Sequence, residues 1–235
     1  MTTPVQILIH GASGRMGQTL LRLAAGHDHL RVAAAVAPQN ATPGLLGASF
    51  HAASDLGNVA AFDVAIDFST PHAFDGILDL CVRRGAAFVS GTTGLTSAQR
   101  TALTVAAERI PVLWAANFSV GVAIMEELVE RAAKALGRWD CDIVEVHHNR
   151  KLDAPSGTAL ALGAAAERGG AEPRYASLRA GDIVGEHLVQ FAGSGERIEL
   201  VHRATNRDIF ASGALHAASR LAGRVPGVYR FRDLL

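Results

Sequence analysis

The chain opens with VQILIHGASGRMG, residues 5–17, and this stretch decides the fold of its first half. The apolar run Val5 to Ile9 predicts a buried strand, and a helical pattern begins at Arg15. Gly11 and Gly14 lie between the strand and the helix, and Gly17 lies at the start of the helix. This order of strand, turn and helix lets a pyrophosphate approach backbone amides at the positive end of the helix dipole. Because the spacing is GxxGxxG rather than GxGxxG, a glycine turn without any ligand is the alternative.

The alternation of strand and helix continues as far as Trp114. Strands are expected at 30–36, 65–68, 86–90 and 112–114, and helices at 15–25, 71–84 and 97–109. Thr70 followed by Pro71 marks one helix start, and Thr96 with Gln99 forms a capping box at another. The strands are apolar throughout rather than alternating, which indicates a parallel sheet covered on both faces. We therefore expect an α/β fold with an N-terminal Rossmann-like, doubly wound sheet.

Beyond Asn117 the pattern changes to strands that few helices separate. The expected elements are a helix at 122–137, a strand at 141–146, a helix from about 156, strands at 177–179, 187–192 and 198–204, and a helix at 210–222. Such a pattern indicates a C-terminal α+β domain with an open mixed sheet. We expect residues 1–118 and 207–235 to form a dinucleotide-binding domain. Residues 119–206 are expected to form a domain for substrate binding and oligomerisation.

A second motif, VEVHHNRKLDAPSGT at 144–158, carries side chains suited to binding an anion and moving protons. His147 and His148 are neighbours at a strand end, so their side chains begin on opposite faces, which disfavours a shared metal ion. An imidazole gives and takes protons near neutral pH, and Lys151 adds a positive charge. A non-functional interpretation, with one histidine in the core and the other at the surface, is the alternative.

The same motif ends where a helix is expected to begin. The backbone amides of Gly157 and Thr158 lie at that start and can bind a carboxylate. Asp153 is expected to cap or pair within the loop, and Arg207, further along the chain, to be a solvated side chain. The motif therefore predicts an anion site with proton donors beside it.

The composition excludes several classes of function. The 235 residues include 22 Lys and Arg against 22 Asp and Glu, so no net positive field attracts nucleic acid or an anionic membrane. The two cysteines, Cys81 and Cys141, lie in apolar segments and are expected to be buried reduced thiols. The first residues show no basic segment followed by an apolar one, the pattern of a signal peptide, and the apolar run at 5–9 is too short to cross a bilayer. We expect a cytoplasmic protein that binds neither nucleic acid nor membrane.

Together, these motifs resemble the dihydrodipicolinate reductase family, whose members are also called 4-hydroxy-tetrahydrodipicolinate reductases. The matching segments are GASGRMG at 11–17, DFS at 67–69, GTTG at 91–94, ANFSVG at 116–121, EVHHNRKLDAPSGT at 145–158 and RAGDIVGEH at 179–187. They cover nearly the whole chain. The segment from the histidine pair to DAPSGT is far more specific than any glycine loop.

The resemblance implies an oxidoreductase that uses NADH or NADPH. Its substrate would be 4-hydroxy-tetrahydrodipicolinate, a cyclic dicarboxylate, which is reduced with loss of water in the diaminopimelate route of lysine biosynthesis. Implied cofactor contacts are Gly11, Ala12, Ser13, Gly14, Arg15, Met16, Gly91, Thr92, Thr93, Ala116, Asn117, Phe118 and Ser119. Implied substrate contacts are His148, Lys151, Gly157 and Thr158. His147 and Lys151 would be the catalytic, proton-handling pair, and which of them donates the proton stays open. A homotetramer built through the late strands is also implied.

Two segments depart from the family's pattern. Ala37-Pro38-Gln39-Asn40 stands where an acidic residue usually follows the second strand. Without that carboxylate a 2′-phosphate is not repelled, and Arg15 is the side chain that could bind it. The choice between NADH and NADPH therefore stays open, with use of both favoured. The segment between Ala166 and Ser177 is also shorter than in many relatives, which we expect to trim a surface excursion.

Two other functions stay open on the residues alone. One is a different nicotinamide oxidoreductase that acts on a sugar or an amino acid, although such chemistry does not require the anion-binding motif at 147–158. The other is a non-catalytic nucleotide-binding protein, such as a redox-sensing regulator or an assembly subunit. The neutral charge and the lack of a helix-turn-helix signal disfavour DNA binding.

Overall fold

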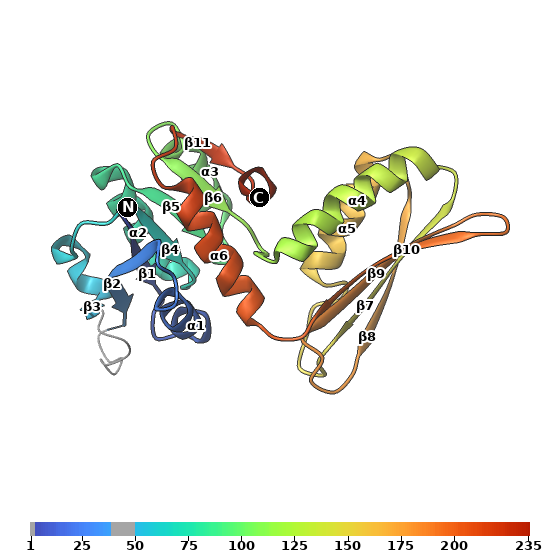
Figure 1. Cartoon of the computed structure of the whole chain (residues 1–235), viewed down its shortest axis with the longest axis horizontal. Coiled ribbons are helices and arrows are strands. Elements are labelled where there is room, and N and C mark those ends of the chain that lie inside the picture. Colours follow the sequence, from blue (N-terminus) through green and yellow to red (C-terminus); the bar gives the residue numbers. More distant parts are fainter. Residues whose placement is uncertain (1–2, 39–49) are drawn as a thin grey trace. The chain divides into compact units, whose positions relative to one another are not determined.

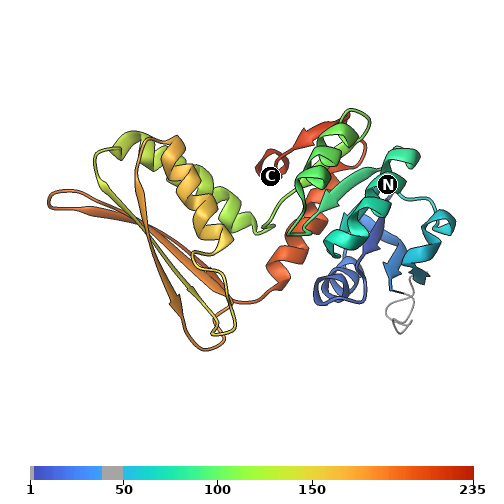
Figure 2. The same ribbon diagram turned by 180° about the vertical axis from the view of Figure 1, so that it is seen from behind.

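The computed structural model describes residues 3–38 and 50–235, and the chain divides into two units (Figures 1 and 2). Unit 1 contains Met1–Phe118 and Phe210–Leu235, and unit 2 contains Ser119–Ile209. The chain therefore leaves unit 1 after Phe118 and returns to it after Ile209.

Unit 1 is built on a seven-stranded sheet. Its strands are β1 Val5–His10, β2 Leu30–Ala37, β3 Phe50–Ala52, β4 Val64–Asp67, β5 Ala87–Ser90, β6 Pro111–Trp114 and β11 Gly227–Tyr229. They lie in the order β11-β6-β5-β4-β1-β2-β3, and all the ladders between these described strands are parallel. Chain order reverses between β1 and β4, and ligands of such sheets bind at the carboxyl ends of strands beside a reversal of this kind.

Helices cover both faces of this sheet (Figures 1 and 2). They are α1 Arg15–Ala24, α2 Pro71–Arg84, α3 Ser97–Ala106 and α6 Asp208–Leu221, and the chain also forms two 3-10 turns, η1 Ala53–Asn58 and η2 Phe231–Leu234. The helices α2 and α3 pack over a core that includes Phe74, Phe88 and Leu103, and α6 crosses the opposite face. The predicted Rossmann-like, doubly wound sheet is confirmed.

Local sequence signals mark several helix starts in unit 1. Thr96 and Gln99 form the predicted capping box at the start of α3. Pro71 is the first residue of α2, directly after Thr70. The helix α3 ends at Ala106, earlier than the expected 109.

Unit 2 is a four-stranded mixed sheet with two helices on one face. Its strands are β7 Asp140–His147, β8 Pro173–Arg179, β9 Gly185–Ala192 and β10 Arg197–Ala204, and its helices are α4 Val120–Leu136 and α5 Gly157–Arg168. In the order β10-β9-β7-β8, the β7–β8 pair is parallel and the other two pairs are antiparallel. The helices α4 and α5 lie side by side, and in both views the far face of the sheet carries no helix. The predicted open mixed sheet is confirmed.

The covered face of this sheet changes from apolar to polar along β7 and β9. Its apolar part, packed beneath the two helices, includes Cys141, Ile143, Val189 and Phe191. Glu145 and His147 continue the same face toward the carboxyl end of β7 because side chains alternate along a strand. His187 of β9 pairs with Glu145 and is also buried. Three polar side chains thus occupy what would otherwise be core positions.

The structure adds elements that the sequence pattern does not reveal. The strands β3 and β11 have three residues each and form the two edges of the seven-stranded sheet. The helix α4 begins at Val120 rather than 122, because the Ser119 side chain accepts a hydrogen bond from the Val122 amide and caps the helix. The strand β8 begins at Pro173 rather than 177, since its whole length pairs with β7.

The two cysteines are buried and free. Burial raises the pKa of the Cys141 thiol to about 11. Among the helices of the described residues, none combines the length and the apolar character that a membrane span requires.

Candidate active site

The residues predicted to bind a nucleotide gather at the carboxyl edge of the sheet in unit 1. The turn 11–14 follows β1, the segment 91–93 follows β5, and the segment 116–118 comes after β6. These three strands are parallel members of one sheet, with β4 between β1 and β5. Their carboxyl ends therefore point to the same edge.

The turn after β1 depends on glycines because the backbone passes very close to its neighbours. Gly11 has a φ of +79°, and a Cβ on it would lie 2.4 Å from the carbonyl oxygen of Phe68. A Cβ on Gly17 would lie 2.3 Å from the carbonyl oxygen of Gly11. Ser13, Gly14 and Arg15 are exposed, Gly11 and Met16 are half-buried, and Ala12 is buried. This exposed backbone at the positive end of α1 fits the pyrophosphate of a dinucleotide.

A buried carboxylate organises the same edge of the sheet. Asp67, the last residue of β4, accepts hydrogen bonds from Ser90 Oγ at 2.9 Å and Thr92 Oγ1 at 2.7 Å. His10 Nδ1 lies 2.8 Å from its other oxygen. Burial would raise the pKa of Asp67, but the hydrogen bonds from His10, Ser69 and Thr92 hold it below its usual value. The carboxylate is therefore ionised at neutral pH and accepts the Nδ1 proton of His10.

Thr92 links this carboxylate to the neighbouring segments. Its carbonyl oxygen accepts a hydrogen bond from Trp114 Nε1 at 2.8 Å, and its hydroxyl accepts one from the Ser69 amide at 3.1 Å. The rings of Phe68 and Phe118 pack with centroids 5.6 Å apart. Thr93 and Ala116 are exposed, Gly91 and Asn117 are half-buried, and Phe118 is buried. The segments after β5 and β6 are thus held by contacts within unit 1, whereas Ser119, at the start of α4, belongs to unit 2.

The end of β2, where a carboxylate for the adenosine ribose usually stands, carries no charge in its described part. The strand ends at the buried Ala37, and Pro38 is exposed. Gln39 and Asn40 lie outside the described residues.

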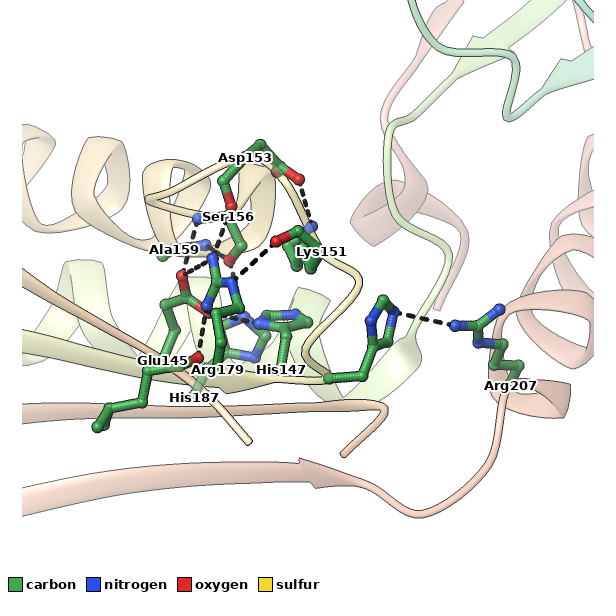
Figure 3. A network of polar contacts seen from close by, with 11 residues as sticks. Glu145, His147, Lys151, Asp153, Ser156, Ala159, Arg179, His187 and Arg207 are labelled. Carbon is green, nitrogen blue, oxygen red and sulfur yellow. Dashed lines mark hydrogen bonds and ion pairs between the residues drawn. The ribbon is translucent and has the colours of Figure 1, made fainter. Parts of the chain in front are cut away.

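Unit 2 holds His147 in a buried cluster of polar groups (Figure 3). His147 ends β7, and its Nδ1 is hydrogen-bonded to Oε2 of Glu145. Arg179 of β8 donates two hydrogen bonds to the same carboxylate, from Nη1 to Oε2 at 3.0 Å and from Nη2 to Oε1 at 2.9 Å. Burial would raise the pKa of Glu145, but hydrogen bonds from Arg179, Ser177 and His147 lower it to about 2. Glu145 is therefore a carboxylate at neutral pH.

Lys151 lies on the loop that follows His147, and this loop is tied to the same arginine. Arg179 donates from Nε to the carbonyl oxygen of Lys151 at 3.3 Å and from Nη2 to that of Asp153 at 2.6 Å. Lys151 Nζ lies 2.9 Å from Asp153 Oδ1. This ion pair lowers the pKa of Asp153. The predicted pairing of Asp153 within its loop is thus present.

The N-terminus of α5 is anchored to this cluster through Ser156. The Ser156 hydroxyl accepts a hydrogen bond from the Ala159 amide at 3.1 Å, and its own amide donates to Glu145 Oε1 at 3.2 Å. His187 Nε2 lies 3.2 Å from the same hydroxyl. Gly157 and Thr158 form the first turn of the helix. A Cβ on Gly157 would meet no atom within 4 Å, so space is open beside its backbone for the carboxylate of a ligand.

His148 and Arg207 meet at a different point of unit 2. Nη2 of Arg207 lies 3.2 Å from Nε2 of His148, and a guanidinium can only donate, so Nε2 is the acceptor. Arg207 is exposed, as expected, but it also contacts a predicted substrate residue. Arg207 therefore joins the candidate residues of unit 2.

The sequence pattern located most of these side chains but missed the groups that hold them. His147, Lys151, Gly157 and Thr158 were predicted from one motif. Glu145, Arg179 and His187 lie within the same motifs, but the sequence pattern assigns them no role. Pairing across 34 positions, as between Glu145 and Arg179, depends on strand register. Within the described residues, no group of three or more His, Cys, Asp or Glu is placed to hold a metal ion.

Comparison with known proteins matches both parts of the chain to one family. The family model described as "Dihydrodipicolinate reductase, N-terminus" matches residues 5–118, and "Dihydrodipicolinate reductase, C-terminus" matches residues 121–235. A protein of Stenotrophomonas maltophilia strain K279a named 4-hydroxy-tetrahydrodipicolinate reductase is 69% identical over 235 residues, covering 99% of this chain and 98% of that one. A protein of the same name from Xanthomonas campestris pv. campestris strain B100 is 63% identical, with 100% and 99% covered.

Solved structures share the fold. A dipicolinate-bound dihydrodipicolinate reductase from Paenisporosarcina sp. TG-14 superposes with a TM-score of 0.83 at 22% identity, covering 99% of this chain and 100% of that one. A DAP dehydrogenase from C. glutamicum gives a TM-score of 0.63 at 14% identity, with 99% and 94% covered. The second likeness reflects the general plan of the fold, whereas the sequence identities above identify the family. The chain belongs to the dihydrodipicolinate reductase family.

Proposed function

We propose that this chain reduces 4-hydroxy-tetrahydrodipicolinate with NADH or NADPH, releasing water and tetrahydrodipicolinate. The observation that carries the proposal is the cluster of His147, Lys151 and the N-terminus of α5, which combines a proton-handling imidazole, an ammonium and open backbone at a helix start. Sequence identity of 69% to a protein named for this activity supports it. The reaction belongs to the diaminopimelate route of lysine biosynthesis.

In this proposal unit 2 binds the dicarboxylate. One carboxylate would lie against the backbone at Gly157 and Thr158, where the helix dipole and the amides favour an anion. Lys151 and His148 would contact the charged groups of the substrate. The Lys151–Asp153 ion pair keeps the ammonium close to this position before substrate arrives.

His147 and Lys151 would handle the protons. Burial lowers the pKa of His147 below its usual value, so the ring is mostly neutral at neutral pH in the free protein. A bound dianion would favour the protonated ring, since opposite charges raise the pKa of a base. We therefore propose that His147 takes up a proton when substrate binds and passes it to the ring being reduced, while Lys151 stabilises negative charge.

Unit 1 would bind the nicotinamide cofactor through the turn after β1 and the segments after β5 and β6. When bound, that cofactor supplies the hydride. The neutral end of β2 leaves the choice between the two cofactors to few contacts. We propose that both are used, with Arg15 as the side chain that favours a 2′-phosphate. The ratio of kcat/KM for NADPH to that for NADH should then fall in an Arg15→Ala variant.

We further propose that the chain assembles as a homotetramer through the face of the unit 2 sheet that carries no helix. Apolar side chains on that face include Val144, Val146, Ala176, Leu178, Leu188 and Val201. Leu178 is 52% exposed and Val201 43% exposed, so the apolar area is open to a partner. An uncovered apolar face of this kind is typical of an interface.

One assay tests the reaction. The condensation product of pyruvate and aspartate semialdehyde is generated in the cuvette, and the absorbance of reduced nicotinamide is followed. We expect consumption by the wild-type chain, a loss of turnover in His147→Gln with little change in cofactor affinity, and mainly weaker substrate binding in Thr158→Val. Turnover with a sugar but not with this substrate would support a different oxidoreductase. Cofactor binding without any turnover would support a non-catalytic role.

A further inference from the structure

We propose that Glu145, held by Arg179, is a positioning residue that keeps a proton on Nδ1 of His147 and so makes Nε2 the atom that exchanges protons with the substrate. This inference rests on the proposed function, since it concerns how the proton-handling imidazole is prepared. Neither Glu145 nor Arg179 touches the substrate in it.

The hydrogen bonds of the carboxylate fix the direction of its bond to His147. Oε1 accepts from Arg179 Nη2 at 2.9 Å and from the Ser156 amide at 3.2 Å. Oε2 accepts from Arg179 Nη1 at 3.0 Å and lies against His147 Nδ1. An ionised carboxylate can only accept. Nδ1 must therefore carry the proton, which leaves Nε2 with the lone pair in the neutral ring.

The same arginine also sets the loop that carries Lys151. Its five N–H groups reach Glu145 and the backbone carbonyl oxygens of Lys151, Asp153 and Leu178. A guanidinium in this planar fork has one arrangement that satisfies all these acceptors. Glu145 and Arg179 thus hold the ring of His147 and the backbone of the loop that carries Lys151 (Figure 3).

Next to Nε2 of His147, the strand β9 carries a glycine instead of a residue with a side chain. A Cβ on this residue, Gly185, would stand 2.9 Å from Nε2 and 3.3 Å from Cδ2. His147 keeps 10% of its side chain exposed, whereas Glu145 keeps none. The Glu145 carboxylate is therefore buried, and the ring of His147 is the part of this pair that can exchange a proton with a substrate.

Charges around His147 give the proposal a measurable consequence. The groups that face the ring are Glu145 on its own strand, Arg179 on β8, Lys151 on the following loop and His187 on β9. Burial, Lys151 and Arg179 lower the pKa of His147, and Glu145 raises it. Burial lowers the pKa of His187 to about 4, so this neighbour stays neutral at neutral pH. Removing the negative charge of Glu145 must move the pKa of His147 further down.

The test compares Glu145→Gln with a matched control, Glu130→Gln. Glutamine keeps the shape of Glu145 but its amide can donate as well as accept, so it no longer selects one tautomer. Glu130 lies on α4, and its carboxylate pairs with Arg168 at 3.0 Å and with Lys134 at 2.7 Å rather than with a histidine. We expect kcat of Glu145→Gln to fall by roughly 10²-fold, with dipicolinate and cofactor affinities little changed. Glu130→Gln should keep the wild-type kcat.

The pH profile separates a positioning role from a structural one. The limb of the kcat/KM profile that is missing in His147→Gln belongs to His147. We expect this limb to move to lower pH in Glu145→Gln and to stay in place in Glu130→Gln. A loss of kcat in Glu145→Gln with an unmoved limb would overturn the inference.

Nitrogen-15 NMR of the imidazoles tests the tautomer in the wild-type protein, even if the variant does not fold. The signals of His147 are identified as those lost in His147→Gln. We expect the neutral ring to be protonated at Nδ1, and protonation at Nε2 would overturn the inference. A wild-type chain that consumes no reduced nicotinamide with this substrate contradicts the proposed function instead, so the two failures are distinguishable.

Discussion

At the scale of single residues, the glycine turn shows how closely backbone geometry and ligand binding are coupled. Gly17 lies in the first turns of α1, where a side chain would press on the backbone of the preceding turn. A Cβ there would come within 2.3 Å of the carbonyl oxygen of Gly11 and 2.5 Å of the Cα of Ala12. Both neighbours are backbone atoms that cannot swing aside. The missing side chain therefore lets the helix start close to the strand and leaves its amides open.

We predict that Gly17→Ala destabilises unit 1 and weakens cofactor binding together. The clash should lower the free energy of unfolding by ~1–3 kcal/mol, measured by urea denaturation. NADH affinity, measured by fluorescence titration, should fall as the turn shifts. Gly57→Ala is the control, because a Cβ on Gly57 meets no atom within 4 Å. Equal stability of the two variants would contradict the role given to Gly17.

Residue identities in the candidate site could be predicted from sequence only where they are close in the chain. His147, Lys151, Gly157 and Thr158 lie in one motif, and the chemistry of each type suggested its role. The bonds from His10 to Asp67 and from Arg179 to Glu145 join residues 57 and 34 positions apart. Such pairs follow from the order and register of strands, and a pattern of single residues does not contain that information.

At the scale of elements, the start of α5 joins a helix cap to the proposed substrate site. Ser156 caps the helix through the Ala159 amide and also contacts His187. The first residues of the helix, Gly157 and Thr158, present the backbone expected to bind a carboxylate. The position of that backbone thus depends on the Ser156 hydroxyl together with the hydrogen bond from the Ser156 amide to Glu145.

We predict that Ser156→Ala weakens substrate binding beyond its effect on stability. Loss of an N-cap typically costs ~1 kcal/mol, which urea denaturation should show. The affinity for dipicolinate, measured by calorimetry, should fall as well because the amides at Gly157 and Thr158 lose their fixed position. The matched control is Thr96→Ala, which removes the cap of α3 in unit 1. If both variants bind dipicolinate as tightly as the wild type, the cap has no part in binding.

Elements were predictable where local signals mark their ends. The capping box at Thr96 and the Pro71 start both lie where the sequence placed them. The edge strands β3 and β11 were not predicted, since each has only three residues and exists through pairing with a neighbour. Ser119 could have signalled the earlier start of α4, because serine is a favoured N-cap residue.

At the scale of the whole molecule, buried histidines make the stability of unit 2 depend on pH. Burial lowers the pKa of His187 from 6.5 to about 4, so the unfolded chain binds a proton more readily than the folded one. The contribution of neutral His187 to the free energy of unfolding is therefore complete above pH 6.5 and is lost as the pH falls toward 4. For His187 alone this amounts to at most ~3 kcal/mol. Burial also lowers the pKa of His147 and His202, which adds in the same direction.

We predict that unit 2 loses stability between pH 7 and pH 5 and that His187→Gln flattens this dependence. Urea denaturation followed by tryptophan fluorescence can report on unit 2 alone, because Trp139 lies there and Trp114 can be replaced by phenylalanine. His27→Gln, at an exposed position of unit 1, should leave the dependence unchanged. An equally steep dependence in His187→Gln would show that other groups cause it.

The proposed homotetramer depends on exposed apolar side chains of the unit 2 sheet. The uncovered face of the unit 2 sheet carries Leu178 on β8 and Val201 on β10, each largely open to solvent. A charge placed in an apolar interface is costly because it loses its hydration without gaining a partner. We therefore predict that Leu178→Glu converts the proposed homotetramer into smaller species in sedimentation velocity. Val105→Glu replaces an equally exposed apolar residue, 55% exposed on α3 of unit 1, and should leave the assembly intact. A wild-type chain that sediments as a monomer, or a Leu178→Glu variant that stays tetrameric, would exclude this face as the interface.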